Sequence, residues 1–458
     1  MISKQAFGAT RYVDPVNGTD AVGCNVNDAV CGAGGNACAS IEYTAENTAS
    51  WQFGDELILC PGTYNTVSGV WKSGTNYTMQ PAPSGGTGYF TIRASTGNIT
   101  IDIPTNTSSQ LWGLRGRNRF QHINVTNAAA TVARWSNVSN TTSDFEIVME
   151  DGTVDYPGSV IGTYFIEFLN ASGYNATAIL RRMKLKDWIN IPGTNTAFIR
   201  NNIATNGSYI STITLEGCLL KNFGNLFYGS PAKVPIHLNL FNNTVTNGTY
   251  SFLYNDSVVD SRSVVQITGN IFNADNTFST PLYFGNLTPD CSSGRCGPPV
   301  NWLVKGNILY KAGEYPDINL DRIADNSAYG NFPDETNYFI NPDFADPNND
   351  DYTPHNGLIT GKGYSANLPA TDIDGNAWTG LSDVGAFKNP SATSPVMLGS
   401  DTLIVIGDSI PAGASYRLIQ DQSLGWLPGW TIYGAGSTCN MTAGANCSSW
   451  GGIIGSNT

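Results

Sequence analysis

Residues 265–272 read Val-Gln-Ile-Thr-Gly-Asn-Ile-Phe, and the spacing of their apolar side chains recurs through the middle of the chain. The shared pattern is apolar, any, apolar, any, any, corner, any, apolar, and the corner position takes Asn, Cys or Met. Because alternating apolar residues predict a strand with one buried face, we expect each copy to be one coil of a solenoid of parallel strands. The five copies, spaced by about 25 to 37 residues, occupy 178–185, 213–220, 238–245, 265–272 and 302–309.

The corner position is Met183 and Cys218 in the first two copies and Asn243, Asn270 and Asn307 in the last three. An amide side chain both donates and accepts hydrogen bonds, so stacked asparagines can satisfy one another and the backbone at a turn. We therefore assign these three asparagines a structural role.

The composition indicates strands and turns, because charged residues make up only 13% of the 458 residues while Gly is frequent. The net charge of −13 and a pI near 4.6 argue against nucleic acid or an anionic membrane as partner. No stretch approaches the roughly 20 apolar residues of a membrane span. The first fifteen residues also lack the apolar run of a signal peptide, so export by another route or an earlier cleavage is expected. The sequence gives no indication of a cofactor or metal.

Nine cysteines indicate disulfides formed outside a reducing cytosol. We expect a bridge between Cys291 and Cys296, and a free, buried thiol at Cys218 in its corner position. At least one further bridge is expected among the four cysteines near the start, which are Cys24, Cys31, Cys38 and Cys60.

Loss and return of the repeat divide the chain into segments. Residues 1–88 are interpreted as an N-terminal cap and first coil, with one short helix in the stretch around 37–50. The coils of the solenoid occupy 89–333, followed by an irregular C-terminal cap. The predicted boundaries of the remaining segments are 334–390 for that cap, 391–400 for a linker and 401–458 for a further domain.

Several short stretches make the first 388 residues resemble the right-handed parallel β-helix proteins of the pectate-lyase-like superfamily. They are YVDPVNGTD at 12–20, GDELILCPGTY at 54–64, the two Gly-Asn-Ile steps at 269–271 and 306–308, DIDGNAW at 372–378 and SDVGAF at 382–387. The resemblance implies an all-β solenoid. It leaves the function open, because the superfamily includes polysaccharide lyases, hydrolases, secreted surface proteins and bacteriophage tailspikes.

Residues 402–413, TLIVIGDSIPAG, resemble the first block of the GDSL, or SGNH, hydrolases. The resemblance implies Ser409 as a nucleophile presented on a strand-to-helix turn, with Gly434 or Gly436 as a second oxyanion donor; we select Gly436. The remaining blocks of that family, which supply an Asn and a catalytic His, are absent here. We therefore expect a partial α/β domain that is inactive as an esterase in the present chain.

The coils carry weaker indications of chemistry. Arg181, Arg182, Lys184 and Lys186 form the densest basic cluster and, with Trp188, are candidate contacts for an acidic sugar. The carboxylates at 150, 151, 155, 187 and 216 could supply a general acid and a general base for the cleavage of sugars. The alternative is that they are solvated surface charges. Residues 372–383 loosely fit a calcium loop, but Ala377 stands where that loop needs Gly, and an Asp-rich turn explains the same residues.

These observations favour an extracellular or virion-borne spike, resembling a bacteriophage tailspike, that binds cell-surface polysaccharide. Such spikes are usually trimers, and attachment to the virion would use the N-terminus. The alternative is a secreted bacterial β-helix protein, either a polysaccharide lyase or a structural adhesin without enzymatic activity.

Overall fold

A computed structural model describes the chain in segments. They are residues 8–25, 29–46, 51–65, 88–102, 112–113, 116–126, 136–140, 144–160, 164–170, 175–190, 197–201, 209–223, 226–229, 235–246, 253–254, 262–274, 301–311, 340–356, 368, 370–378, 383–389, 430–434, 437–441, 446–447 and 452–453. Two compact units are distinguished, 1–392 and 393–458.

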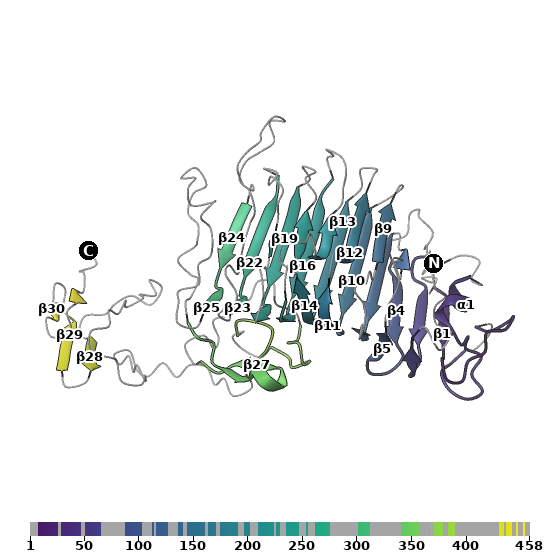
Figure 1. Ribbon diagram of the computed structural model, residues 1–458, viewed down its shortest axis with the longest axis horizontal. Helices are drawn as coiled ribbons and strands as arrows, with labels where there is room; N and C mark the ends of the chain where they lie inside the picture. Colours follow the sequence, from purple (N-terminus) through teal and green to yellow (C-terminus); the bar gives the residue numbers. More distant parts are fainter. Residues whose placement is uncertain are drawn as a thin grey trace, which may run out of the picture. The chain divides into compact units, whose positions relative to one another are not determined.

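Three parallel sheets build the first unit, and successive strands of each sheet stand side by side in chain order (Figure 1). Sheet 1 contains β1 (Thr10–Val13), β2 (Glu56–Leu59), β4 (Phe90–Ala94), β7 (Arg117–Gln121), β10 (Phe145–Glu150), β13 (Ala176–Arg181), β16 (Ser211–Glu216), β19 (Ile236–Phe241), β22 (Val264–Thr268) and β24 (Asn301–Lys305).

Sheets 2 and 3 take the following strands of each coil. Sheet 2 contains β3 (Thr63–Tyr64), β5 (Ile99–Asp102), β8 (Ile123–Thr126), β11 (Thr153–Val160), β14 (Lys184–Asn190), β17 (Leu219–Lys221), β20 (Thr244–Thr246), β23 (Ile271–Ala274) and β25 (Ile308–Lys311). Sheet 3 contains β6 (Trp112–Gly113), β9 (Ser136–Asn140), β12 (Tyr164–Asn170), β15 (Ala197–Asn201), β18 (Phe227–Gly229) and β21 (Leu253–Tyr254). The chain passes through the three parallel sheets in turn and then returns to the next strand of the first sheet. This arrangement is a parallel β-helix, as expected from the sequence.

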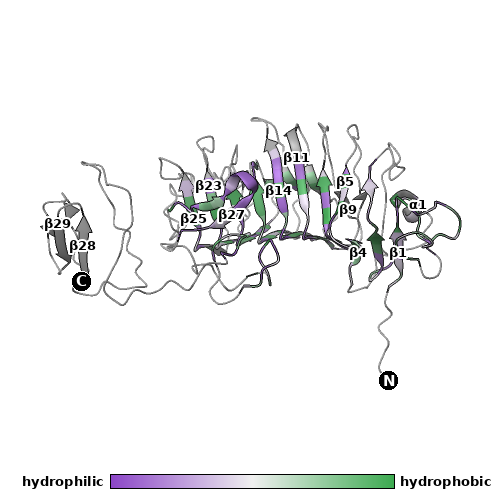
Figure 2. Cartoon of the chain, turned by 90° about the horizontal axis from the view of Figure 1, so that it is seen from below, coloured by the Kyte–Doolittle hydropathy of each residue, from purple (hydrophilic) through white to green (hydrophobic). Residues whose placement is uncertain are grey.

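The five sequence copies lie in register across sheet 1. Leu180 pairs with Leu215, which pairs with Leu240, and the same row continues through Ile267 to Val304. The first four side chains of this row are at most 1% exposed and belong to one continuous core. The prediction of a shared buried face is confirmed, and the strands in Figure 2 carry green residues together with white or purple ones.

A left-handed residue begins the corner between sheets 1 and 2 in coil after coil. Gly269 and Gly306 have φ of 68° and 64° there, and Asn242 has 53° in the coil before. The backbone N–H groups of Asn242 and Gly269 bond to the last residue of the following sheet 1 strand, Asn242 to the Thr268 oxygen at 3.1 Å and Gly269 to the Lys305 oxygen at 3.2 Å. The positive φ turns the chain sharply enough for the corner residue to enter the core.

Asn243, Asn270 and Asn307 form a hydrogen-bonded ladder directly after these left-handed residues. The Nδ2 of Asn243 donates to Oδ1 of Asn270, and the Nδ2 of Asn270 donates to Oδ1 of Asn307, both over 2.9 Å. Each Oδ1 also accepts the backbone N–H of the preceding corner residue, beginning with Cys218. Cys218 is a free thiol with no exposed surface, as expected, and burial raises its pKa to about 12.

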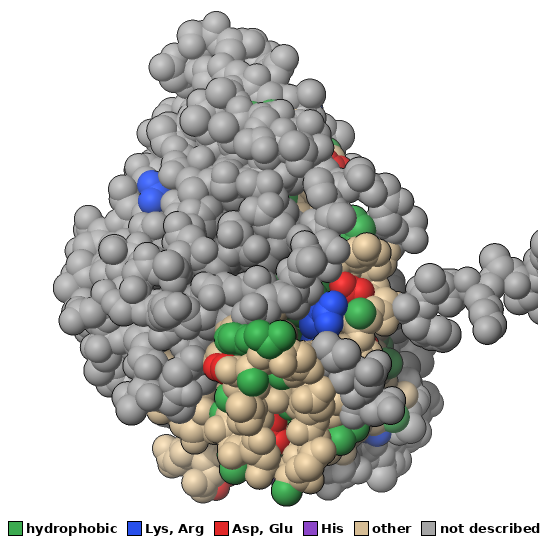
Figure 3. Space-filling model, turned by 90° about the vertical axis from the view of Figure 1, so that its right-hand side faces the viewer, with side chains coloured by type: hydrophobic (Ala, Val, Ile, Leu, Met, Phe, Trp, Pro, Cys, Tyr) green, Lys and Arg blue, Asp and Glu red, His purple; other side chains and the backbone are tan. Residues whose placement is uncertain are grey.

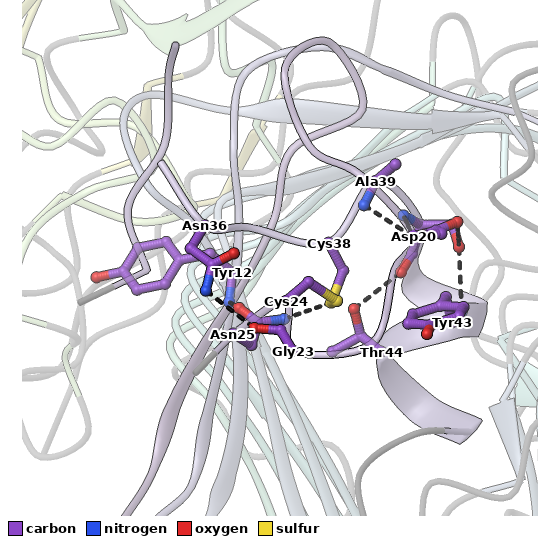
Figure 4. The surroundings of a disulfide bond; sticks show 11 residues. Tyr12, Asp20, Gly23, Cys24, Asn25, Asn36, Cys38, Ala39, Tyr43 and Thr44 are labelled. Atoms are coloured by element: carbon purple, nitrogen blue, oxygen red, sulfur yellow. Dashed lines mark hydrogen bonds between the residues drawn. A yellow bond between two sulfur atoms is a disulfide. The ribbon is translucent and has the colours of Figure 1, made fainter. Parts of the chain in front are cut away.

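Two disulfides fasten a loop-rich cap to the first coil. They join Cys24 to Cys38 and Cys31 to Cys60, so all four cysteines of the predicted cluster are bridged. The expected short helix is α1 (Ile41–Glu46). In Figure 4 the Cys24–Cys38 bridge lies beside the side chain of Asn25, whose amide oxygen accepts the Tyr12 N–H at 2.6 Å.

The cap carries the large hydrophobic side chains that are exposed in the described part of the chain, Val16, Val22 and Val30. Figure 3 looks onto this end of the solenoid, where hydrophobic side chains lie among mostly uncharged atoms. The buried Asp14 holds the backbone of the cap in place, because its carboxylate accepts hydrogen bonds from the N–H groups of Val16, Asn17 and Gly32. Burial acts to raise the pKa of Asp14, but these hydrogen bonds outweigh it and lower the pKa.

The described residues between 340 and 389 form a segment that we call the clasp. It contains β26 (Phe344–Asp346), the 3-10 turn η2 (Pro347–Asn349) and β27 (Asp351–Pro354), and it lies against the outer side of sheet 2. Its apolar residues, Tyr352, Val384, Ala386 and Phe387, cover Leu219, Ile271 and Ile308. Gly385 has φ of 93°, and a Cβ there would lie 2.8 Å from Ile271, so only glycine allows this close approach.

The second unit is described through four strands. β28 (Trp430–Gly434) pairs antiparallel with β29 (Ser437–Met441), and β30 (Asn446–Cys447) pairs antiparallel with β31 (Gly452–Ile453). The α/β arrangement expected for this part stays a prediction.

Ile267→Asp tests the shared core. Burying a charge without a partner is expected to lower the free energy of unfolding by at least about 4 kcal/mol or to prevent folding. Gln266→Asp is the matched control, because Gln266 precedes Ile267 in β22 and points to the other side of the strand. Chemical denaturation measures both variants, and comparable losses in the two would contradict the assignment of faces.

Asn270→Ala tests the ladder at its central member. The change leaves the buried Asn243 N–H without its acceptor, and is expected to cost about 2 to 4 kcal/mol of stability. Asn239→Ala removes an amide from the outer side of sheet 1, where it bonds to the Thr214 hydroxyl, and should cost about 1 kcal/mol or less. The ladder has no special weight if thermal unfolding ranks the two variants in the opposite order.

Candidate functional site

One row of side chains crosses the outer face of sheet 1 near the beginning of five successive strands. Arg117 of β7 pairs with Glu146 of β10, which pairs in turn with Thr177 of β13, Thr212 of β16 and His237 of β19. Each precedes an inward-facing residue of the core, so the alternation of the strands directs it outward. Since parallel strands lie about 4.8 Å apart, five of them span about 19 Å.

This row forms the floor of a pocket with a volume of about 390 Å³. Asp144, Asn175 and Ile210, which directly precede three of the strands, form the rim, and Phe145 also lines the pocket. The rim is itself ordered, because Asp144 accepts two hydrogen bonds from Asn175, and the Asn175 side chain accepts the Ile210 N–H at 2.8 Å. The described lining comprises Arg117, Asp144, Phe145, Glu146, Asn175, Thr177, Ile210, Thr212 and His237.

Arg117 is held at one end of the pocket by Glu146 and Tyr89. Its Nε donates to a Glu146 oxygen at 2.9 Å, and its Nη2 donates to the Tyr89 hydroxyl at 2.9 Å. The Tyr89 hydroxyl donates in turn to the other Glu146 oxygen at 2.5 Å. The Arg117 and Arg119 guanidinium carbons also lie 4.3 and 4.4 Å from the Tyr89 ring centre. The guanidinium therefore has a fixed orientation and a compensated charge.

The titration of the pocket follows from these contacts. Burial, the hydrogen bond to Glu146 and the Glu146 charge raise the pKa of Tyr89, so the phenol stays protonated and remains a donor. Burial lowers the pKa of His237, although a hydrogen bond with the backbone of Arg262 acts in the opposite direction. The imidazole is therefore mostly neutral at pH 7, and can act as a hydrogen-bond acceptor or a base.

The predicted basic cluster is divided by the corner between two sheets. Arg181 ends β13 in sheet 1, where it bonds to Glu150 at 2.9 Å and to Glu216 at 2.6 Å. Arg182 occupies the left-handed corner with φ of 48° and makes a bidentate pair with Asp151. The four basic residues therefore do not share one face, and each guanidinium is matched by carboxylates on neighbouring coils.

Lys184 and Lys186 lie in β14 of sheet 2 and hold the clasp. Lys184 binds Asp374 at 2.9 Å, while Lys186 and Lys221 both bind Asp350. Trp188 was also misplaced as a sugar contact, because it is 1% exposed and packs against Phe165 and Phe198 in the core. Asp187 explains the error: its φ of 56° interrupts the alternation of the strand, so the following residue turns inward.

The carboxylates considered for acid and base chemistry also have structural partners. Asp187 accepts a hydrogen bond from the Asn222 side chain at 2.7 Å, whereas Glu216 binds Arg181 on a different sheet. Asp155 lies in sheet 2, where burial and the charge of Asp187 raise its pKa. In the Asp-rich loop, Asp372 accepts the N–H groups of Asp374 and Asn376, so it builds a turn.

Three further sequence predictions fall on residues outside the described segments. They are Ser409 and Gly436 of the esterase hypothesis and the proposed bridge between Cys291 and Cys296.

Sequence reasoning missed the pocket residues Arg117, Glu146 and His237, and also Tyr89, which bonds to Arg117 and Glu146 beside the pocket. A signal was present in the copies themselves. The position directly before the first apolar residue of a copy faces outward, and it holds Thr177, Thr212 and His237 in three successive copies.

Comparisons with known proteins add one solved structure to this description. No family model matches the chain, and no curated protein matches it. The PL6 family polysaccharide lyase Pedsa3628 from Pseudopedobacter saltans is similar over 76% of this chain and 98% of its own, with 11% identity and a TM-score of 0.27. At that TM-score the assignment to the class of parallel β-helix proteins rests on the strand pairing.

Asp350 gives the clasp a pH dependence. Burial acts to raise the pKa of Asp350, but hydrogen bonds from Lys186 and Lys221 outweigh it and lower the pKa. A carboxyl group with a lowered folded pKa stabilises the fold above its unfolded pKa of about 3.9, and that contribution is lost as the pH falls through the folded value. We expect the clasp to loosen below about pH 4.

Hydrogen exchange of residues 344–354 measures this change between pH 6 and pH 2.5, after correction for intrinsic exchange rates. Asp350→Asn should show faster exchange already at pH 6, because both lysines lose their shared anion. Asp351→Asn is the matched control, since Asp351 is exposed. The ion pairs do not hold the clasp if Asp350→Asn protects this segment as well as the unsubstituted chain does at pH 6.

Proposed function

We propose that this protein is an extracellular parallel β-helix that binds polysaccharide in the pocket across β7, β10, β13, β16 and β19. The observation that carries the proposal is the row of five outward side chains held in register on five coils. A long, shallow line of hydrogen-bonding groups suits an extended polymer, whose repeating units meet successive coils.

The chemistry of the lining supports a sugar as ligand. Thr177, Thr212 and Asn175 offer hydroxyl and amide groups that can both donate and accept hydrogen bonds. Glu146 and His237 add acceptors on either side of the two threonines. Sugar hydroxyl groups need partners of both kinds, so this lining matches them better than an apolar ligand.

The setting of the protein supports a place outside the cell. Two disulfides fit an oxidising environment. In the described part of the chain, no helix is both long and apolar enough to cross a membrane.

The finer hypotheses extend this proposal. In the first, the protein is a tailspike-like spike of a virion surface, assembles as a homotrimer and attaches through its N-terminus. In the alternative, it is a secreted bacterial lyase or a structural adhesin. An esterase module beginning at Ser409 stays a proposal based on the sequence alone. Purification with virions as a trimer would favour the first hypothesis.

Thr212→Trp tests the pocket. An indole in place of Thr212, between Thr177 and His237, should occupy the space of a sugar ring and weaken polysaccharide binding at least 10-fold without lowering the melting temperature. Thr91→Trp is the matched control, because Thr91 points outward from β4 of the same sheet and lies outside the pocket. A glycan array followed by calorimetry measures binding. Equal affinity in the Thr212→Trp variant would refute the pocket as the binding site.

A further inference from the structure

The charged side chains on the outer face of sheet 1 form ion pairs. Arg93 binds Glu56 at 3.2 Å, and Arg117 binds Glu146 at 2.9 Å. Glu150 lies between two cations, 3.9 Å from Arg119 and 2.9 Å from Arg181, and Arg181 also reaches Glu216. On the described sheet 1 strands from β4 to β16, the four outward-facing arginines are therefore matched by four glutamates.

Pairing of this kind removes the means by which a protein recognises an acidic polymer. Arginine binds a carboxylate or sulfate through parallel N–H groups. In the pocket the Arg117 Nε and Nη2 are already directed at Glu146 and the Tyr89 hydroxyl. To bind these two groups, a uronic acid unit would have to displace Glu146 and leave that carboxylate without its partner.

The rest of the described lining adds negative charge. Asp144 accepts hydrogen bonds from the neutral Asn175, and in the described segments it forms no ion pair. His237 contributes no full positive charge at pH 7, because burial lowers its pKa. The whole chain carries −13, which also repels a polyanion at low salt.

We infer that the pocket of sheet 1 selects an uncharged polysaccharide and discriminates against polymers that carry carboxylate or sulfate groups. The inference rests on the proposed function and narrows it to a ligand class. Glu146 is the residue that sets this selectivity, because it occupies the guanidinium of Arg117.

Matched pairs of polymers test the inference. Fully methyl-esterified homogalacturonan is compared with the same polymer after de-esterification, and dextran with dextran sulfate. We expect the uncharged member of at least one pair to bind, and its charged counterpart to bind at least 10-fold more weakly at 20 mM salt. The difference should shrink at 0.5 M salt, where charges are screened over a few ångströms.

Glu146→Gln should reverse part of the preference. It frees the Arg117 guanidinium, so affinity for the de-esterified polymer should rise at least 5-fold while the melting temperature reports on folding. Glu56→Gln is the matched control, because it frees Arg93 on the same face outside the pocket. A rise of equal size in both variants would count against a selective role of Glu146.

The outcomes separate the inference from the proposed function. Tighter binding of the charged polymer, with an affinity that falls steeply as salt rises and is lost in Thr212→Trp, overturns the inference and leaves the binding site standing. Failure of every polymer to bind overturns both. Preferential binding of the uncharged member, lost in Thr212→Trp, supports both.

Discussion

Every coil of this solenoid must bring the chain back to the same register, one strand higher. The constraint falls on the corner between sheets 1 and 2, where a left-handed residue turns the backbone and the next residue fills the core. From Cys218 to Asn307 that place is held by hydrogen bonds running from coil to coil, so an error at one corner would be felt by the next. Within its own coil Asn270 bonds only to the Thr268 oxygen, so most of the ladder's hydrogen bonds need the neighbouring coils.

With the register fixed, the outer faces of the sheets can differ. Sheet 2 presents Leu219, Ile271 and Ile308 to the outside, and the clasp covers them. Along the first strand positions of sheet 1 the outward residues are polar, and a pocket opens there. The same repeat thus has an outer face on sheet 2 that packs against the clasp and an outer face on sheet 1 that can contact a ligand. The two faces differ in their outward residues, which the core does not constrain.

The sequence predicted the features that are local to one coil. Alternation placed Leu180 and Ile267 inside, and the chemistry of Asn indicated the ladder, because both arguments need only a few neighbouring residues. Contacts between coils could not be obtained this way. Lys186 meets Asp350 across 164 positions, and Arg117 meets Glu146 across 29, since loop lengths and the return of the clasp decide these pairs. The prediction for Trp188 was wrong because one left-handed residue, Asp187, reverses the alternation of the strand.

The two corners at Asp151 and Arg182 carry an evolutionary consequence. Both residues have positive φ, a conformation that glycine adopts without strain, and their side chains bind each other through two hydrogen bonds of 2.6 and 2.8 Å. Replacing either residue by glycine would relieve the backbone strain at that corner, but would leave a half-buried charge on the neighbouring coil without its partner. The pair is therefore expected to show epistasis: each single substitution is selected against, while the double change to glycine, as seen at Gly269 and Gly306, is open to neutral drift.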